Sequence, residues 1–547
     1  MRRLRFVLAV LIALAAGRGQ AQVEGMLTGR LEWAGEVEVA ADVWVAPGAE
    51  LVVRPGTRVR FAEAPSTKTD PLFWQPGTEL AVGGVLRVEG TPGAPVVFEG
   101  PAWGGLVAAP GSAVTLRHGV VRGAEEGFLV VGALAEVEGV RIEGGATGVV
   151  AGPGGRLTGR DLEVQGSEVG ILRAGGELAV EGLVVDAADA GTLEVPEAAP
   201  DAVPLEPRAV AGPRVELLGE YTVDRDETWS GEVVVSGRVT VVPEAVLTLA
   251  PGTRVRFRRI DTNGDGLGEG ELLVLGGIRS LGTLSAPVVF ESAEAEPRPG
   301  DWDKVSLIAS EDPGNRFAYT VFRHGVQALH AHFSAMTVED CLFAENVRAV
   351  QFQESPSTVI RRSVFWKNKQ ALRFRDSQVA VAGVWLGRNL YGVHAFRAKL
   401  AFTEGELTAH PLGSFLAKES RVTLERVRFS AGRDGARFKD PGGVVEIRAC
   451  TVRDVAQDAL SFQEVEARVE GCELDGAGLD LVGADNAEVV LRHNLLGFSG
   501  RHAIHVSGPA RVDARWNRWG GDPAERIHDG TDEPGLGTVL WEPKEEP

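Results

Sequence analysis

Cysteines are scarce in this chain, and no long apolar segment follows its first residues. Only three cysteines occur among 547 residues, which excludes a disulfide-stapled scaffold, so the fold must be stabilised by its core. A membrane-spanning helix needs roughly 20 consecutive apolar residues, and no segment approaches that length. We therefore expect no membrane insertion of the mature chain.

Motifs of common enzyme classes are also missing. The sequence has no adjacent pair of aspartates, no Gly-x-Ser-x-Gly, no phosphate-binding loop, no dinucleotide fingerprint and no His-Glu-x-x-His. The nearest approach to a polygalacturonase-like motif is Arg-His-Gly, at residues 117–119 and 323–325. The two sites occupy matching points of a repeated module, which favours an inherited turn over catalysis. A non-catalytic protein is therefore favoured.

Basic residues are in deficit. The chain has 76 acidic and 56 basic residues, for a net charge of −20. Such a surface repels the phosphate backbone of nucleic acids, and it suits solubility or the binding of cations. Nucleic acid is therefore excluded as a partner.

The first residues predict export. Three arginines within the first five residues precede an apolar run at residues 6–16 and a small-x-small site that ends at Ala21. This order is typical of a secretory signal. Residues 1–21 are assigned as a signal peptide, and the mature chain is expected in the periplasm or outside the cell. An uncleaved N-terminal anchor is the alternative.

Turn residues are abundant, and the chain contains an internal repeat. Residues 51–61 (LVVRPGTRVRF) match residues 247–257 (LTLAPGTRVRF), and residues 79–99 match residues 271–291. Within each copy, β-branched runs alternate with Pro-Gly turns, as in strands joined by tight turns. The chain therefore contains two copies of one module.

The repeat divides the chain into two blocks. A stretch with five prolines at residues 196–213 lies between the copies and is expected to be a linker. It leaves an N-terminal β-helical block, residues 22–195, and a C-terminal β-helical block, residues 214–547. Whether the two blocks form one continuous solenoid stays open.

Apolar residues recur at a constant step in the C-terminal block. Such a step predicts that each turn of chain lays its strand on the previous one, so we expect an all-β, right-handed parallel β-helix with coils of 21 to 23 residues. The inward anchors are expected to be Phe322, Phe343, Phe365, Leu386, Leu407, Phe429, Val452, Leu474 and Leu496, with a second series at Phe352, Phe374 and Phe396.

The same step places small and polar residues in columns. Three asparagines each lie three positions after an anchor, where they are expected to form a stacked ladder at a turn. Three cysteines each lie two positions before an anchor and should point inward. For the last two cysteines, free thiols are favoured over a disulfide. The residues are Asn346, Asn368 and Asn389, and Cys341, Cys450 and Cys472.

With these features, the chain resembles the bacterial exported right-handed parallel β-helix repeat proteins of the pectate-lyase-like superfamily. The duplicated PGTRVRF module resembles their N-terminal capping coils, and residues 517–530 (NRWGGDPAERIHDG) resemble the Asn-x-Trp-Gly ending of such helices. The resemblance implies a cap over residues 517–543, in which Trp519 closes the open end of the core. The group includes lyases, hydrolases, binding proteins and structural proteins, so the resemblance does not fix a function.

The second module carries a calcium-type loop that the first lacks. Residues 261–271 (DTNGDGLGEGE) match the start of the D-x-[DN]-x-[DN]-G signature, in which alternate oxygen-bearing side chains wrap a hard cation. The expected ligands are Asp261, Asn263, Asp265 and Glu269. Position twelve is a leucine instead of the usual bidentate glutamate, and the alternative is a bare turn without calcium.

Histidine and aspartate are densest in the late coils. His502 and His505 lie three residues apart, which on a strand points them to opposite faces. Solvated turn residues are therefore favoured over a metal site. His330 and His332 share a face and are a weaker metal candidate. The late group comprises His493, His502, His505, Asp480 and Asp485.

Two tryptophans are candidates for binding a glycan. Trp366 and Trp385 are neighbours of inward anchors on adjacent coils, so both should point outward from one sheet as diagonal partners. An indole face can stack on a sugar ring, and Lys367, Arg388 and Tyr391 flank the pair. The alternative is that a neighbouring turn covers both rings.

The sequence leaves three functions open. The first choice is an exported, non-catalytic β-helix protein that binds polysaccharide or cell-envelope components on a rigid surface. The second is a polysaccharide lyase or glycoside hydrolase with an unrecognised groove site, and the third is a structural envelope or adhesion component. Carboxylates near an arginine in a lateral groove would favour the enzyme, and a charged surface without aromatics would favour the structural protein.

Overall fold

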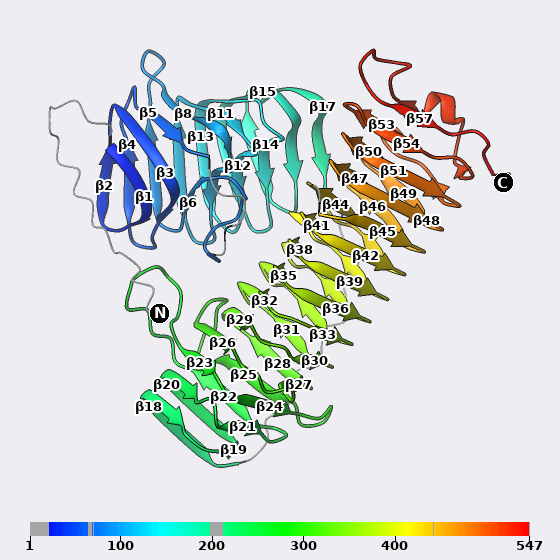
Figure 1. Ribbon diagram of the computed structural model, residues 1–547. Coiled ribbons are helices and arrows are strands. Elements are labelled where there is room, and N and C mark those ends of the chain that lie inside the picture. Colours follow the sequence, from blue (N-terminus) through cyan, green and yellow to red (C-terminus); the bar gives the residue numbers. More distant parts are fainter. Residues whose placement is uncertain (1–20, 64–67, 69, 197–211, 441, 546–547) are drawn as a thin grey trace. The chain divides into compact units, whose positions relative to one another are not determined.

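The chain is built almost entirely of β-strands (Figure 1). The computed structural model describes residues 21–63, 68, 70–196, 212–440 and 442–545. These contain 57 strands and one short 3-10 helix, η1 (Pro523–Glu525), and strands pair in parallel from coil to coil. The prediction of an all-β parallel β-helix is confirmed. The predicted signal peptide, apart from Ala21, and most of the predicted linker lie outside the described residues.

The strands belong to two compact units. Unit 1 holds β1 (Ala21–Leu27) to β17 (Val184–Glu194) in one 17-stranded sheet. Unit 2 holds β18 (Arg214–Val223) to β57 (Thr538–Leu540) in a 26-stranded and a 14-stranded sheet. The short segment of residues 261–266 groups with unit 1.

The two copies of the repeated module pack alike. In unit 1 the ring of Trp103 stacks on Phe61 with centroids 4.1 Å apart, and in unit 2 the ring of Trp302 stacks on Phe257 at 4.6 Å. Each indole N–H donates to a backbone carbonyl at 2.7 Å. Matched contacts at matched positions are what an internal duplication produces.

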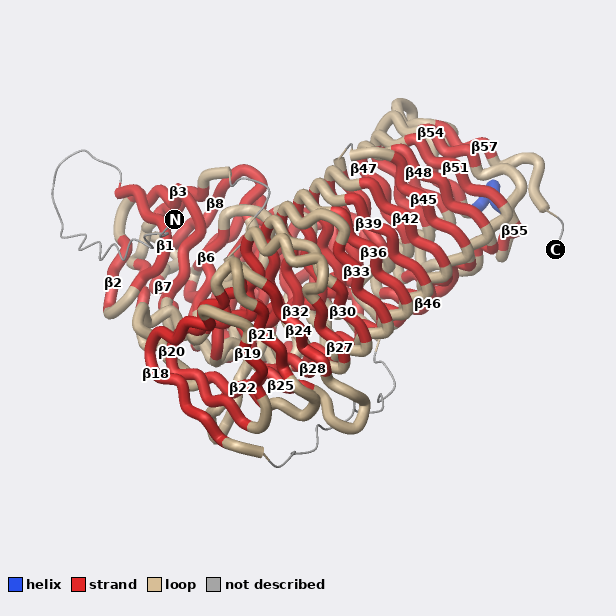
Figure 2. The backbone as a smooth tube through the Cα atoms, turned by 60° about the horizontal axis from the view of Figure 1, so that its bottom comes forward, coloured by secondary structure: helices blue, strands red, loops and turns tan. Residues whose placement is uncertain are grey.

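A representative coil of unit 2 has three strands. β33 (Thr358–Arg361) lies in the 14-stranded sheet, whereas β34 (Val364–Trp366) and β35 (Gln370–Arg375) lie in the 26-stranded sheet. Figure 2 shows such strands as rows that repeat from coil to coil. Side chains alternate between inside and outside along each strand, so each coil adds one layer to a continuous inner core.

The first predicted column of anchors is observed. Phe322 pairs with Phe343, Phe343 pairs with Phe365, and the register continues through every predicted anchor to Leu496. The three phenylalanine rings stack with centroids 4.7 and 4.9 Å apart. Like residues therefore form the inner column, as the constant step requires.

The second predicted column ends one member early. Phe352 pairs with Phe374, but the next partner is Ala395. This coil is one residue shorter than the step of 22 residues that the prediction assumed, so Phe396 pairs with Arg375 instead. The assignment of Phe396 to this column was wrong.

The predicted asparagine ladder is confirmed. The backbone N–H of Asn346 donates to Oδ1 of Asn368 at 3.0 Å, and that of Asn368 donates to Oδ1 of Asn389 at 2.9 Å. Each side-chain amide also donates to a buried backbone carbonyl, such as that of Phe322. His410 follows at the same corner, and its Nδ1 donates to the carbonyl of Asn389 at 3.1 Å.

The cysteines lie at a different corner and are free and buried, as predicted. The backbone N–H of Cys450 donates to Sγ of Cys472 at 3.3 Å, that of Cys472 donates to Oδ1 of Asn494 at 2.8 Å, and that of Asn494 donates to Asn517 at 2.9 Å. The two thiols thus continue an asparagine ladder with weaker acceptors. Burial raises the pKa of the Cys341 thiol to about 12.

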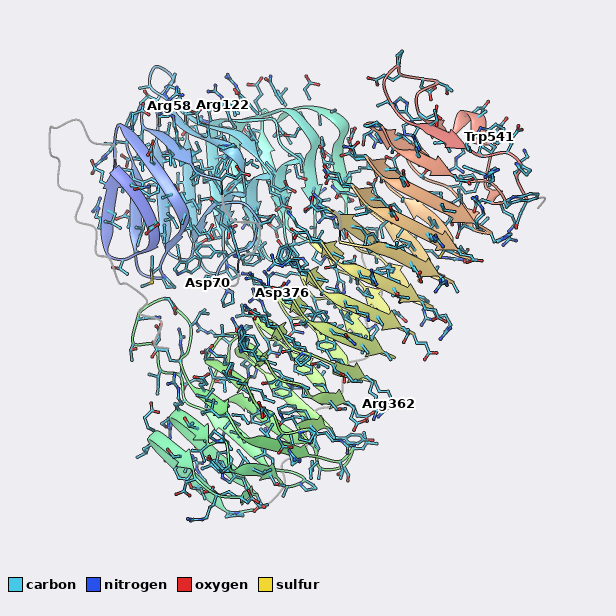
Figure 3. The ribbon with its side chains drawn as sticks, viewed as in Figure 1. Arg58, Asp70, Arg122, Arg362, Asp376 and Trp541 are labelled. Atoms are coloured by element: carbon cyan, nitrogen blue, oxygen red, sulfur yellow. The ribbon has the colours of Figure 1, made fainter. Side chains whose placement is uncertain are left out.

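The C-terminal end of unit 2 is covered by aromatic and apolar side chains. Trp519 pairs with Leu496, the last predicted anchor. Trp519, Leu536 and Trp541 are half-buried and pack against the inner core. Trp541 is labelled in Figure 3. These side chains cover core residues that an open end would expose to water.

Candidate functional site

The two candidate tryptophans stack on the outside of unit 2. Trp366 ends β34 and Trp385 begins β37 (Trp385–Gly387), the paired strand of the next coil. They are diagonal partners, and their ring centroids lie 5.4 Å apart with an interplanar angle of 24°. Gly387 lies beneath both rings, and a Cβ there would come within 2.6 Å of Trp385. The absence of a side chain at this position therefore allows the stack.

Trp366 is buried although it points outward. It belongs to an outer apolar cluster separate from the inner core, and only 8% of it is exposed. The alternative of a covered ring therefore holds for Trp366, although outward-facing apolar residues on neighbouring coils cover it instead of a turn. Trp385 is half-buried at the margin of this cluster. The other buried members are Val289, Val321, Leu342 and Ala344.

Two of the three predicted flanking residues lie close to the pair. Nζ of Lys367 lies 5.6 Å, and Cζ of Arg388 5.8 Å, from the ring centroid of Trp366, both within cation–π range. Tyr391 begins β38 (Tyr391–Phe396), and its ring lies 5.3 Å from that of His394. Tyr391 is not a member of the outer cluster.

An open groove of about 570 Å³ lies beside Trp385. It follows a corner at which one residue of each coil has a left-handed backbone, with φ of 47° at Arg362, 60° at Gly383, 54° at Glu404 and 54° at Arg426. Gly383 contributes no side chain, which leaves space between the side chains of its neighbours above and below. Figure 3 shows Arg362 projecting outward from unit 2.

Ion pairs between successive coils line this groove. Arg426 lies 3.0 Å from Glu404, and Arg428 lies 2.7 Å from Glu406. The hydrogen bond to Glu404 raises the pKa of Arg426. The groove thus combines one indole wall with guanidinium and carboxylate groups. Sequence reasoning missed these groove residues because each resembles an ordinary exposed charge.

The calcium-type loop lies between β22 (Arg254–Phe257) and β23 (Glu271–Val274). The carboxylate of Asp261 accepts from the backbone N–H of Gly264 at 2.8 Å and of Gly266 at 3.1 Å. Asn263 accepts from the N–H of Asp265 and donates to its carboxylate, both at 2.9 Å. The backbone N–H of Glu269 donates to the carbonyl of Ile260. These contacts do not test calcium binding, which stays a prediction.

Part of the late histidine and aspartate group comes together. Asp480, His502 and His505 have ligand atoms within 4.8 Å of one another. The interpretation as solvated turn residues was wrong for Asp480, whose side chain is only 1% exposed. His493 lies apart and bonds to Glu545. Asp485 ends β50 (Val482–Asp485), whose coil partner there is Ser507.

His528 is a neighbour that sequence reasoning missed. It pairs with His505 in the next coil, and the signal that could have found it is the 23-residue step between the two. Elsewhere, the rings of His330 and His332 lie 6.5 Å apart. These two histidines share a face as predicted.

Comparison with known proteins gives no assignment. No protein-family model and no curated protein matches the chain. Among solved structures, the periplasmic alginate epimerase AlgG is 10% identical, with a TM-score of 0.29 over 58% of this chain and 77% of its own; a mutant of it gives 0.33 over 60% and 76%, also at 10% identity. The catalytic unit of a GH87 alpha-1,3-glucanase from Streptomyces thermodiastaticus is 12% identical, with a TM-score of 0.22 over 61% and 64%. Similarities with TM-scores this low do not assign a function to the chain.

Within the described residues, no helix is long and apolar enough to cross a membrane.

Proposed function

We propose that the protein is an exported β-helix protein of the pectate-lyase-like kind that binds polysaccharide, or a related cell-envelope glycan, in the groove beside Trp385. The carrying observation is that this groove has an aromatic wall held in place by a second, buried indole. A fixed aromatic face supplies apolar contact to a sugar ring at little entropic cost, while charged and polar groups around it hold the hydroxyls.

The groove suits a chain more than a single sugar. It is open, and its lining residues come from four successive coils. Strands in adjacent coils are spaced about 4.8 Å apart, so the lining extends over about 14 Å, the length of roughly three sugar units. The rigid backbone of stacked coils fixes this surface before binding, which reduces the conformational entropy lost on association.

The test is a polysaccharide screen on the purified mature chain, followed by variants. Trp385→Ala should weaken binding to the glycan that the screen identifies by at least about tenfold, or about 1.4 kcal/mol. Trp516→Ala is the matched control, because Trp516 is an exposed tryptophan of the same unit outside the groove. Equal affinity of the Trp385 variant and the wild type would contradict the proposal.

A polysaccharide lyase or glycoside hydrolase is the second candidate function, and the carboxylates that line the groove support it. Glu404 and Glu406 both line the groove within ion-pair distance of arginines, and most glycoside hydrolases use a pair of carboxylates. The same screen should therefore read the release of reducing or unsaturated ends. Release that Glu406→Gln abolishes, with binding retained, would establish the enzyme. Binding without release supports the non-catalytic function.

We also propose that the loop at residues 261–271 binds calcium. Carboxylate and amide oxygens are the ligands that calcium prefers, and single extracellular loops bind it at about millimolar concentration. Millimolar calcium should raise the melting temperature of the wild type, and a chelator should reverse the rise. Asp261→Asn together with Asp265→Asn should remove the response. A wild type whose melting temperature is the same in calcium and in chelator would rule the site out.

A further inference from the structure

The last coils of unit 2 hold a group of imidazole and carboxylate side chains outside the Trp385 groove. Asp480 lies in the turn before β50, and His502 lies in the turn before β53 (Ile504–Ser507). His505 lies on β53 and His528 on β56 (Ile527–His528). Four side chains from three successive coils therefore meet at one corner.

This corner differs little in length from the same corner of an earlier coil. In register, Phe365 and Phe374 are equivalent to Leu496 and Val506 of the strands β52 (Leu495–Leu496) and β53. The first pair is nine residues apart and the second is ten residues apart, so the later corner is one residue longer. The group therefore depends on which residues occupy this corner, and not on a long insertion.

The side-chain atoms are at coordination distance from one another. Oδ1 of Asp480 lies 3.2 Å from Nδ1 of His502, and Oδ2 lies 3.1 Å from Nδ1 of His505. Two ligand atoms on one ion, each bonded at about 2.1 Å, lie roughly 3.0–3.4 Å apart. The ring centroid of His528 is 5.3 Å from that of His502 and 5.2 Å from that of His505, close enough for a side-chain rotation to bring it in.

Burial and ligand type define which ion would fit. The carboxylate of Asp480 is 1% exposed, while the three imidazoles are between 24% and 28% exposed. The group is therefore anchored in the protein and open on one side. Imidazole nitrogen with one carboxylate suits zinc and its neighbours in the first transition row, and does not suit calcium or magnesium.

Arg501 supports the carboxylate. Its guanidinium donates from Nε to Oδ1 of Asp480 at 3.1 Å, and the backbone N–H of His502 donates to the same oxygen at 3.0 Å. Such outer hydrogen bonds are typical of metal-ligating carboxylates. Nη2 of Arg501 also lies 3.0 Å from Nδ1 of His505, so this end of the guanidinium must move when an ion binds at that nitrogen.

We propose that Asp480, His502, His505 and His528 bind one divalent transition-metal ion, with zinc as the representative. The site is separate from the Trp385 groove, and the proposal does not rest on polysaccharide binding. It also differs from the calcium-type loop, because its donors are mainly nitrogen.

The test is a zinc titration of the full mature chain, in competition with a chromophoric chelator. The expected result is one zinc ion per chain, and a loss of affinity of at least about tenfold in His502→Ala, in His505→Ala and in His528→Ala. His493→Ala is the matched control and should bind zinc as the wild type does, because His493 lies at a different corner, against Glu545.

Folding is checked separately. Circular dichroism and the melting temperature should match the wild type in the three histidine variants, since these rings are partly exposed. Asp480→Asn is left out of the set of variants, because it would also remove the ion pair between the buried Asp480 and Arg501. A wild type that binds no zinc at micromolar concentration, or histidine variants that all retain wild-type affinity, would overturn the proposal.

Discussion

At the scale of single residues, His410 occupies a position at which the preceding coils have an asparagine. It follows Asn346, Asn368 and Asn389 at the same corner and is fully buried. Its Nδ1 donates to the carbonyl of Asn389, and its Nε2 has no hydrogen-bond partner among the residues that the structure describes. Burial lowers the pKa of His410 to about 4, against an ordinary value of 6.5. The imidazole is therefore held neutral in the folded chain at pH values where the unfolded chain protonates it.

This difference predicts loss of stability in acid. Above pH 6.5 the ring is neutral in both states, so His410 adds no pH dependence. As the pH falls from 6.5 towards 4, the unfolded state takes up the proton first, and the free energy of unfolding should fall by up to about 3 kcal/mol. His410→Asn should extend the ladder and remove this component in urea unfolding at pH 7 and pH 4. An unchanged difference between the two pH values would contradict the assignment.

At the scale of ladders and strands, a thiol accepts where an amide would serve better. Asn494 accepts the N–H of Cys472, whereas the N–H of Cys450 reaches only the sulfur of Cys472. Cys472→Asn should therefore stabilise unit 2 by about 1 kcal/mol, and Cys472→Ala, which leaves that N–H without an acceptor, should destabilise it by about 1–2 kcal/mol. Denaturant unfolding measures both. The ladder account fails if the asparagine variant is the less stable of the two.

The elements also show what sequence can and cannot predict. The anchors from Phe322 to Leu496 and the asparagine ladder could be predicted because stacking repeats one environment at one step. Phe396 was misplaced because a coil one residue shorter preserves the fold while shifting one column. The burial of Trp366 depends on outward-facing side chains of several coils, which the coil step does not identify. The step relates His528 to its register partner His505, but it does not show that His502, which lies in a turn, is also close.

At the scale of the whole molecule, the two units have separate sheets. Among the strands of the described residues, those up to β17 form one sheet and those from β18 form two others. Cleavage within residues 196–213 by a protease of broad specificity should therefore yield two β-rich fragments, and calorimetry of the intact chain should show two unfolding transitions. Protease resistance of this stretch together with a single transition would show that the units unfold as one.

The register that continues from Phe322 to Leu496 also constrains how the length of the chain can change. Val452 and Leu474 are equivalent positions of successive coils, so loss of residues 452–473 would bring Leu474 into the place of Val452 and leave every later contact intact. Loss of half that number would present polar side chains to the core and apolar ones to water. Viable insertions and deletions should therefore come in multiples of one coil, and related chains should differ in length by whole coils.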